Sequence, residues 1–316
     1  MSVETTGADD AVAWGEPGEP RQAATTRRGL TALAARLRGR LLVYLVLLLA
    51  AGFFLAPLYV MLVTSLKDAD EIRSGNLLAL PRALNLDAWS TAWSSACTGV
   101  DCNGLAPFFW NSVLMTVPAV LISTVWGAVN GYVLSLWKFR GSELLFGLLL
   151  FGVFMPFQVV LLPMSQVLGL LGLSSSIAGL ILVHCLAGLA STTLFFRNYY
   201  EAFPTELVRA AQIDGASFFQ IFRRILLPSS GPIIVVTVIW QFTNIWNDFL
   251  FGASFADVDS MPMTVALNNL VNTSTGVKEY NVNMAAAVIA ALPTLLVYIV
   301  AGRYFVRGLM AGAVKG

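Results

Sequence analysis

Four polar residues recur at helical spacing within an apolar stretch late in the chain. They lie four, three and four residues apart, and Asn247 stands beside the last of them: Thr237, Gln241, Asn244 and Asp248. At 100° per residue this spacing puts all four on one narrow face of a helix. Amides and carboxylates hydrogen bond to hydroxyl groups, and the indoles of Trp240 and Trp246 can cover the apolar face of a sugar ring. The pattern predicts a substrate path for a sugar, with a polar seam that holds helices together as the alternative.

The other residues able to do chemistry are few. His184 is the one histidine, and inside an apolar stretch it is expected to be a neutral packing residue, with a ligand role as the alternative. The three cysteines include no CxxC pair, so no metal site is predicted. In an oxidising compartment Cys97 and Cys102 could close a small disulfide, the alternative being two free thiols, and Cys185 is expected to pack inside a span.

The composition predicts a membrane protein. Of 316 residues, 57% are hydrophobic and only 12% are charged, more apolar surface than a soluble domain needs. The formal net charge of +1 gives no reason to expect nucleic-acid binding. The sequence contains no Walker A motif, so we expect that this chain does not hydrolyse ATP by itself. The predicted class is an all-α polytopic membrane protein.

Six apolar stretches are each long enough to cross a hydrocarbon core of roughly 30 Å. Pro156 and Pro163 predict a kink or a break in the third, and Gly127 and Gly131 form a small-xxx-small pair in the second. Residues 1–40, rich in Gly, Pro, Ala, Thr and charge, predict a disordered cytoplasmic tail with a basic end before a transmembrane domain over 41–316. The six predicted spans lie near 41–66, 110–137, 143–168, 175–196, 229–252 and 284–306.

Lysines and arginines predict the orientation of these spans. If the first segment is cytoplasmic, the segments on its side hold fifteen of the nineteen basic residues. The positive-inside rule then puts both termini and the segment 206–228 in the cytoplasm, and the loops 67–109 and 253–283 outside. The outer segments hold the remaining four basic residues, Lys67, Arg73, Arg82 and Lys278.

The segment 204–228, between two predicted spans, has a helical pattern of its own. A first short helix is expected over 206–213, with Gly215 as its left-handed stop. Ser217 and Gln220 form a capping box for a second helix. The pattern predicts two short helices joined at a glycine, with an amphipathic helix on the membrane surface as the alternative. The apolar face of the second helix is expected to consist of Phe218, Phe219, Phe222, Ile225 and Leu226, and Pro228 is expected to end the helix.

This segment resembles the EAA loop of ABC-importer membrane permeases, with Arg209-Ala210-Ala211, Gly215 and Ile225-Leu226-Leu227-Pro228 at the family's spacing. In that family the loop is cytoplasmic and docks in a cleft of the ATPase subunit, which binds ATP and Mg, so no cofactor is expected on this chain. Arg209 stands where the family has a leading Glu, and an acid-specific contact is therefore not implied. The implied coupling residues are Glu206, Arg209, Ala210, Ala211, Asp214, Gly215, Phe218, Phe219, Phe222 and Arg223.

Further motifs are similar to the carbohydrate, maltose-permease-like branch of these permeases, and look closest to permeases of glucose/mannose importers. They are FTNIWNDFLFG (242–252), MTVALNNLVNTSTG (263–276), KEYNVNMAAA (278–287) and the terminal VRGLMAGAVKG. The resemblance implies a type I ABC-importer permease fold with six transmembrane helices in the bacterial cytoplasmic membrane. The partners it implies are a homologous second permease, two ATPase subunits and an external sugar-binding protein. In this type the better-defined sugar site can lie mostly on the partner permease.

Rival functions fit the residues less well. A secondary transporter is expected to carry coupling acids near the bilayer midplane, and Asp248 is the one carboxylate well inside a predicted span. A membrane-embedded enzyme would have only His184 and Asp248 for acid–base chemistry. Another sugar, an oligosaccharide or a polyol, is the alternative substrate for an ABC permease.

The orientation leads to a labelling prediction. In single-cysteine variants treated with an impermeant thiol reagent on intact cells, Ser94→Cys should be modified and Gln220→Cys should not, because only the first faces outward. Permeabilised cells, in which both positions should react, provide the control. Modification of Gln220→Cys alone in intact cells would reverse the predicted topology.

Overall fold

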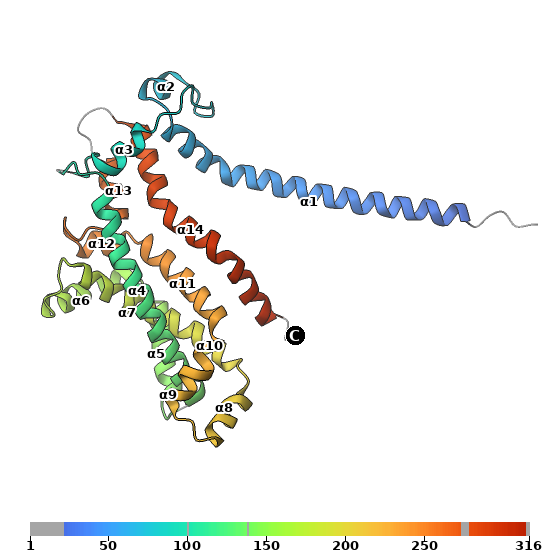
Figure 1. Cartoon of the computed structure of the whole chain (residues 1–316), viewed down its shortest axis with the longest axis vertical. Coiled ribbons are helices and arrows are strands. Elements are labelled where there is room, and N and C mark those ends of the chain that lie inside the picture. Colours follow the sequence, from blue (N-terminus) through green and yellow to red (C-terminus); the bar gives the residue numbers. More distant parts are fainter. Residues whose placement is uncertain (1–21, 100, 138, 273–277, 314–316) are drawn as a thin grey trace, which may run out of the picture. The chain divides into compact units, whose positions relative to one another are not determined.

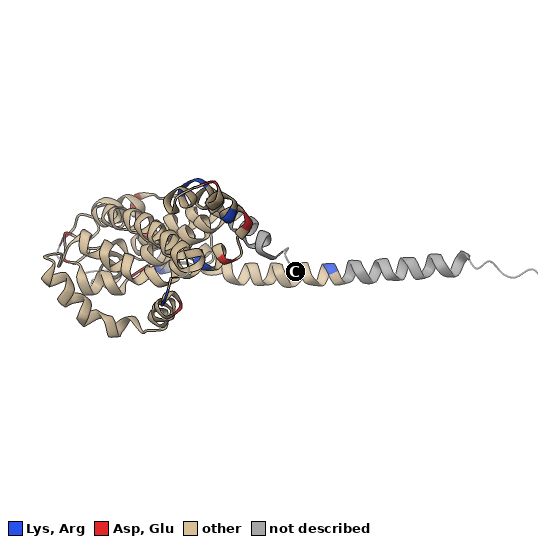
Figure 2. Cartoon of the chain, turned by 90° about the horizontal axis from the view of Figure 1, so that it is seen from below, with Lys and Arg blue, Asp and Glu red and all other residues tan. Residues whose placement is uncertain are grey.

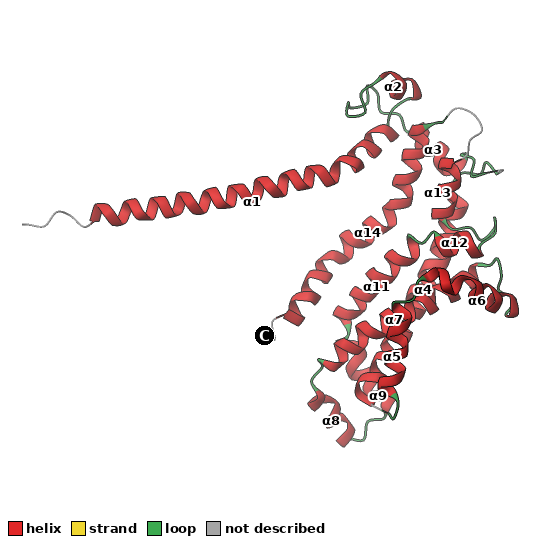
Figure 3. Cartoon of the chain, turned by 180° about the vertical axis from the view of Figure 1, so that it is seen from behind, coloured by secondary structure: helices red, strands yellow, loops and turns green. Residues whose placement is uncertain are grey.

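The structure is a computed structural model that describes residues 22–99, 101–137, 139–272 and 278–313, and within these ranges it contains helices and no strand (Figures 1 and 3). The chain divides into two compact units, Met1–Tyr59 and Val60–Gly316. The long helices are α1 (Gln22–Ser65), α4 (Ala106–Tyr132), α7 (Ile177–Glu201) and α14 (Tyr280–Ala313). The shorter ones are α2 (Ala69–Ser74), α3 (Asp87–Ser94), η1 (Val133–Trp137), α5 (Ser142–Val153), α6 (Phe157–Leu170), α8 (Thr205–Ile213), α9 (Phe218–Ile221), η2 (Phe222–Leu226), α10 (Leu227–Ser229), α11 (Gly231–Trp246), α12 (Leu250–Phe255) and α13 (Met263–Asn272).

The structure of the first unit differs from the predicted disordered tail over part of its length. Helix α1 begins at Gln22, so residues 22–40 are helical where the composition predicted disorder, and residues 1–21 lie outside the described residues. The segment from Leu30 to Leu42 is built mainly of Ala, Leu and Arg, which have high helix propensity. Because this run continues directly into the first apolar stretch, the helix extends without a break.

The described chain has four helices that are long and apolar enough to cross a membrane, and six spans if each of two bent helix pairs counts as one. One bent pair is α5 and α6, which meet at 106°, and the other is the run Phe218–Ser229 with α11, at 77°. The predicted break in the third stretch is confirmed at Pro156, which precedes α6 in an extended conformation, whereas Pro163 lies within α6. Figure 2 shows that most of the described ribbon carries neither acidic nor basic residues.

Helices α4 and α7 form the most extensive helix pair of the second unit, and two glycines make this contact possible. A Cβ on Gly127 would lie 2.6 Å from Cβ of Thr192, and one on Gly131 would lie 2.6 Å from Cβ of Phe196. Real Cβ atoms do not approach so closely, so only glycine lets the two backbones meet at this distance. The predicted role of the glycine pair is confirmed.

The two ends of the second unit carry different short elements. Helices α8 and α9 lie at one end, and α2, α3 and α13 lie at the other (Figures 1 and 3). The sequence predicts loops over 67–109 and 253–283, but α3 and α13 fold there and bury apolar residues against α14. These helices are shorter than a span, so long apolar stretches do not indicate them. Their buried residues include Ala88, Ala92, Met263 and Ala266.

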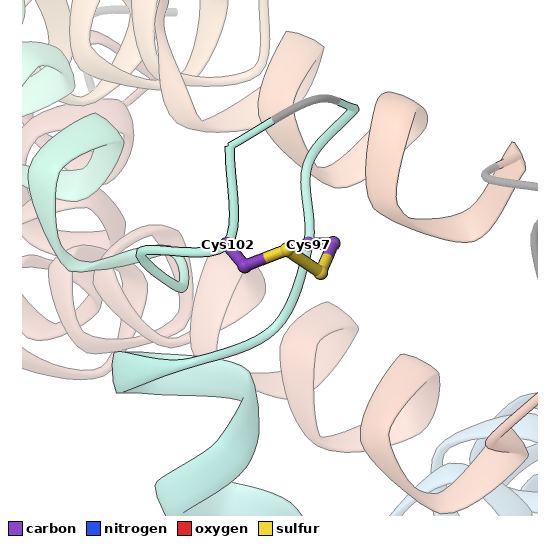
Figure 4. Close-up of a disulfide and its surroundings, with 2 residues drawn as sticks. All are labelled: Cys97 and Cys102. Atoms are coloured by element: carbon purple, nitrogen blue, oxygen red, sulfur yellow. A yellow bond between two sulfur atoms is a disulfide. The ribbon is translucent and has the colours of Figure 1, made fainter.

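The loop after α3 is closed on itself by covalent and hydrogen bonds. Cys97 and Cys102 are joined by a disulfide (Figure 4). Inside this ring the backbone N–H of Thr98 donates to the carbonyl of Asp101 at 2.9 Å. Cys185, by contrast, is a free and buried cysteine in α7.

Arg197 ties the end of α7 to the start of α5. Its Nη2 donates to both carboxylate oxygens of Glu143 at 3.0 Å and lies 2.9 Å from Oε1 of Glu201. The guanidinium also stacks 3.7 Å from the ring centroid of Phe146. The charge of Arg197, predicted to lie on the cytoplasmic side, is therefore paired with two carboxylates of the same chain.

The glycine contact leads to a stability prediction with a matched control. Gly131→Ala should lower stability by about 1–3 kcal/mol, because the new methyl group meets the backbone as well as the side chain of the facing helix. Gly147→Ala, in α5, has open space at its Cβ and should be neutral or stabilising through helix propensity. Thermal unfolding in detergent measures both, and an equal effect of the two substitutions would contradict the role of the contact.

Candidate functional site

The predicted polar stripe does not lie on one helix. Helix α11 ends at Trp246, and Asn247 is its C-cap, so Asp248 lies beyond the helix rather than one turn further along it. Oδ2 of Asp248 accepts hydrogen bonds from the backbone N–H groups of Phe251 (3.0 Å) and Gly252 (3.2 Å). A carboxylate that caps the next short helix competes with continuation of the first, which explains the break.

A cavity of about 380 Å³ nevertheless collects part of the stripe. Its walls come from the end of α5, the start of α6, the middle of α7, the end of α11 and the start of α12. Gln241, Asn244 and Asp248 line it, and Trp240 stands beside them. Three of the five residues predicted for the substrate path therefore face one space, with an indole next to them.

Gln241 has a packing role as well as a place on the cavity wall. Its Nε2 donates to Oγ of Ser123 in α4 at 2.9 Å, and both side chains are buried. Gly188 in α7 leaves room for the amide, because a Cβ there would lie 2.0 Å from Nε2 of Gln241. The alternative of a polar seam therefore describes Gln241, which joins α4, α7 and α11.

The two other predicted residues lie outside the cavity lining. Thr237 is fully buried, and its Oγ1 has no hydrogen-bond partner among the described residues. Asn247 turns to α14, where its Oδ1 accepts from Oγ1 of Thr294 at 3.4 Å. Trp246, expected to flank the stripe, is buried and donates from Nε1 to the carbonyl of Ala290 at 2.9 Å. Helical spacing alone could not separate these positions, because the facing helix decides which side is open.

The cavity also contains a residue that the sequence predicts to be a packing residue, with a ligand role as the alternative. His184 lines the cavity from α7, and its Nε2 lies 3.8 Å from Oδ2 of Asp248. In the sequence, the one indication of a functional role for His184 is that a lone histidine lies within an apolar stretch. Its proximity to a carboxylate 64 positions later in the chain could not be read from spacing.

The hairpin has the predicted geometry. Helix α8 spans Thr205–Ile213, and Gly215 has φ +77°, the left-handed conformation expected at its end. The capping box of Ser217 and Gln220 is present, with both reciprocal hydrogen bonds formed. The second helix consists of α9, a π-helical segment η2 and α10, and it passes through Pro228 to Ser229 instead of ending at the proline.

The aromatic face of the hairpin differs from the expectation. Phe222 is only 8% exposed, and the rings of Phe218 and Phe222 stack on Tyr132 with centroids 4.4 and 5.7 Å apart. These two residues pack inside the chain, because α9 and η2 lie against the end of α4. Phe219, by contrast, is 64% exposed and Ile213 is 86% exposed. The other exposed residues of the predicted coupling set are Glu206, Arg209, Ala210, Asp214, Gly215 and Arg223, and Ala211 is partly buried.

The architecture defines a multi-span helical membrane protein with a cavity among its helices and a helical hairpin at one end. Residues 29–310 match the family model for the inner membrane component of binding-protein-dependent transport systems. The chain belongs to this family of ABC transporter permeases, whose members are not enzymes themselves because the ATPase is a separate subunit.

Curated relatives and a solved structure agree with this assignment. The chain is 39% identical to a probable ABC transporter permease protein of Pyrococcus horikoshii, over 88% of this chain and 98% of the relative. It is 30% identical to a xylose/arabinose import permease protein of Haloferax volcanii, over 85% and 92%. The crystal structure of a bacterial ABC transporter that imports the acidic polysaccharide alginate matches with a TM-score of 0.70 at 21% identity, over 92% of this chain and 100% of that chain. The homologues include sugar importers, and the fold is that of an ABC-importer permease.

Some residues of the stripe pack against other helices and others only line the cavity, and this difference leads to a stability prediction. Gln241→Ala should lower stability by about 1–3 kcal/mol, because it removes a buried hydrogen bond between α11 and α4 and the packing of the side chain against α7. Asn244→Ala should change stability by less than about 0.5 kcal/mol, because Asn244 is exposed and donates only to the carbonyl of Trp240 in its own helix. Thermal midpoints in detergent test this, and a larger loss for Asn244→Ala would refute it.

Proposed function

We propose that this chain is one permease subunit of an ATP-driven importer for a carbohydrate, with glucose or mannose as the first candidates. The observation that carries the proposal is the cavity in which Gln241, Asn244, Asp248 and Trp240 meet. Amides, a carboxylate and an indole are the groups that bind sugar hydroxyls and ring faces. In a family whose transport depends on a binding protein, such a cavity suits a sugar delivered from outside.

The hairpin is proposed to couple this path to a partner ATPase. Phe219 and Ile213 are large apolar side chains that remain exposed, and they are the anchors that a cleft on the ATPase could bury. Arg223 and Arg224 are exposed in the middle of the second helix, where they can meet acidic groups of the partner. Phe218 and Phe222 transmit movement inward, because they stack on Tyr132 at the end of α4.

The proposed assembly contains this chain, a homologous second permease, two cytoplasmic ATPase subunits that bind ATP and Mg, and an external sugar-binding protein. Both termini and the hairpin are proposed to lie in the cytoplasm. The position of α8 and α9 at the end of the second unit opposite α2, α3 and α13 supports a hairpin and outer loops on different sides of the membrane.

A pentose is the second candidate substrate. The relative from Haloferax volcanii, named for xylose and arabinose import, supports it. Pentoses and hexoses differ by one hydroxymethyl group, so the polar residues of the cavity suit both. An oligosaccharide or a polyol would need contacts beyond this cavity.

An assay of sugar-stimulated ATP hydrolysis tests the proposal. The chain is purified with the subunits that accompany it, reconstituted in proteoliposomes with the binding protein, and supplied in turn with glucose, mannose, xylose, arabinose and maltose. We expect glucose or mannose to stimulate ATP hydrolysis and to accumulate inside. Uptake that is driven by an ion gradient without ATP would indicate a secondary transporter and contradict the proposal.

Two hairpin variants provide the matched control for coupling. Phe219→Ala should reduce sugar-stimulated ATP hydrolysis and ATPase co-purification at unchanged thermal stability, since the side chain is exposed. Phe222→Ala should instead lower stability by about 3–5 kcal/mol, because it leaves a hole in the packing against Tyr132. Normal stimulation and normal co-purification in Phe219→Ala would mean that this residue does not anchor the ATPase.

A further inference from the structure

The cavity contains a buried polar atom that lacks a hydrogen bond. The side chain of His184 is 4% exposed, and its Nε2 has no hydrogen-bond partner in the described part of the chain. Oδ2 of Asp248 lies 3.8 Å away, too far for a hydrogen bond. One oxygen atom placed between them can lie within hydrogen-bond distance of both. Since buried polar groups in native proteins are normally paired, this gap indicates the place of a ligand atom.

The two groups are held in place by contacts that leave the gap open. The ring of His184 packs edge-on against Phe251, with centroids 5.5 Å apart. Asp248 is fixed by the backbone N–H groups at the start of α12. Both side chains therefore keep their positions before a ligand arrives, which lowers the entropy cost of binding it.

The chemistry of the gap favours a hydroxyl group. A carboxylate only accepts hydrogen bonds, whereas the neutral imidazole can donate one through Nε2–H. A hydroxyl oxygen can accept from His184 while its own hydrogen is donated to Asp248. A chloride or a carboxylate in the gap would meet the charge of Asp248 instead, and none of the residues that line the cavity is Lys or Arg. The cavity therefore disfavours an anionic sugar such as a uronate.

The size and shape of the cavity suit one sugar ring. About 380 Å³ is near the lower end of the roughly 300–1,000 Å³ typical of small-molecule sites. The exposed indole of Trp240 offers a flat apolar surface on the same wall as Asn244. A ring stacked there can place hydroxyl groups toward the polar residues, as sugars do on aromatic side chains.

We propose that this cavity binds one neutral sugar ring and that His184 is a specificity-determining residue, which with Asp248 holds a single ring hydroxyl. This inference rests on the proposed function and deepens it by naming the substrate class and one recognised group. It predicts that removal of one particular hydroxyl from the sugar has the same effect as removal of the imidazole.

A cycle of sugar analogues and variants tests the pairing. Uptake of D-glucose and each of its monodeoxy analogues is measured in proteoliposomes with the complete complex, for the native chain, His184→Leu and the neighbouring control Cys185→Ser. One analogue should be taken up about tenfold less well than glucose by the native chain, and His184→Leu should abolish the discrimination against that analogue alone. The contribution of the binding protein cancels, because it is the same in every comparison.

The outcomes separate a binding role from a structural one. For each analogue, the ratio of its uptake to that of glucose is compared between the native chain and the variant. If His184→Leu leaves every one of these ratios unchanged, or lowers uptake of glucose and all analogues alike, the proposed contact is overturned. If His184→Leu does not assemble, His184→Gln, which keeps a donor, takes its place and should weaken the same discrimination. Cys185→Ser should leave all ratios as they are, because Cys185 faces the carbonyl of Ala119 in α4 and does not line the cavity.

A charged sugar tests the substrate class. The native chain should discriminate against D-glucuronate relative to glucose, and Asp248→Asn, which retains an acceptor for the cap of α12, should reduce that discrimination. Efficient uptake of glucuronate by the native chain would overturn the neutral class. Failure of the native complex to take up any sugar would overturn the proposed function as well. Sugar uptake in which the ratio of analogue to glucose uptake does not respond to His184→Leu would overturn only the role of His184.

Discussion

The close contact between α4 and α7 is the constraint on which the rest of the second unit depends. It exists because Gly127 and Gly131 have no side chains at the points where Thr192 and Phe196 press against α4. In a membrane, where lipid tails are as apolar as leucine, helices gain little from burying apolar area against each other, and close packing of backbones has to supply the association. A single methyl group at either glycine would push the helices apart.

The same contact positions the groups of the cavity. Ser123 of α4 and Gly188 of α7 together receive the amide of Gln241, and that hydrogen bond sets the position of α11 across both helices. With α11 fixed in this way, its last turn places Asn244 in the cavity, and the break just after the helix places Asp248 near His184 of α7. A polar group that holds the helices thus lies next to polar groups that remain open, so the seam describes Gln241 while the proposed sugar path concerns Asn244 and Asp248.

At the end of α4 that contains Tyr132, aromatic packing joins the hairpin to the helices. Tyr132 follows Gly131 directly, and Phe218 and Phe222 stack on it, so the second hairpin helix is packed against the end of α4. Phe219 points away from this cluster and remains exposed. In the proposed mechanism, an ATPase that holds Phe219 can therefore act on α4 and α7 through a short chain of stacked rings, while the cavity lies against the middle of α7.

The sequence by itself determined the membrane class, the places of the apolar stretches, the break at Pro156, the left-handed Gly215 and the capping box of Ser217, because each depends on local composition or on the allowed conformations of one residue. It did not determine where the helix with the polar stripe ends, since that depends on Asp248 capping the next helix. Nor could it tell that Phe222 is buried and Phe219 exposed, because two phenylalanines on one short helix have the same propensity and differ only in what packs against them. The approach of His184 to Asp248 was likewise decided by tertiary structure alone, because it requires α7 and α11 to be brought together by glycine contacts and one buried amide.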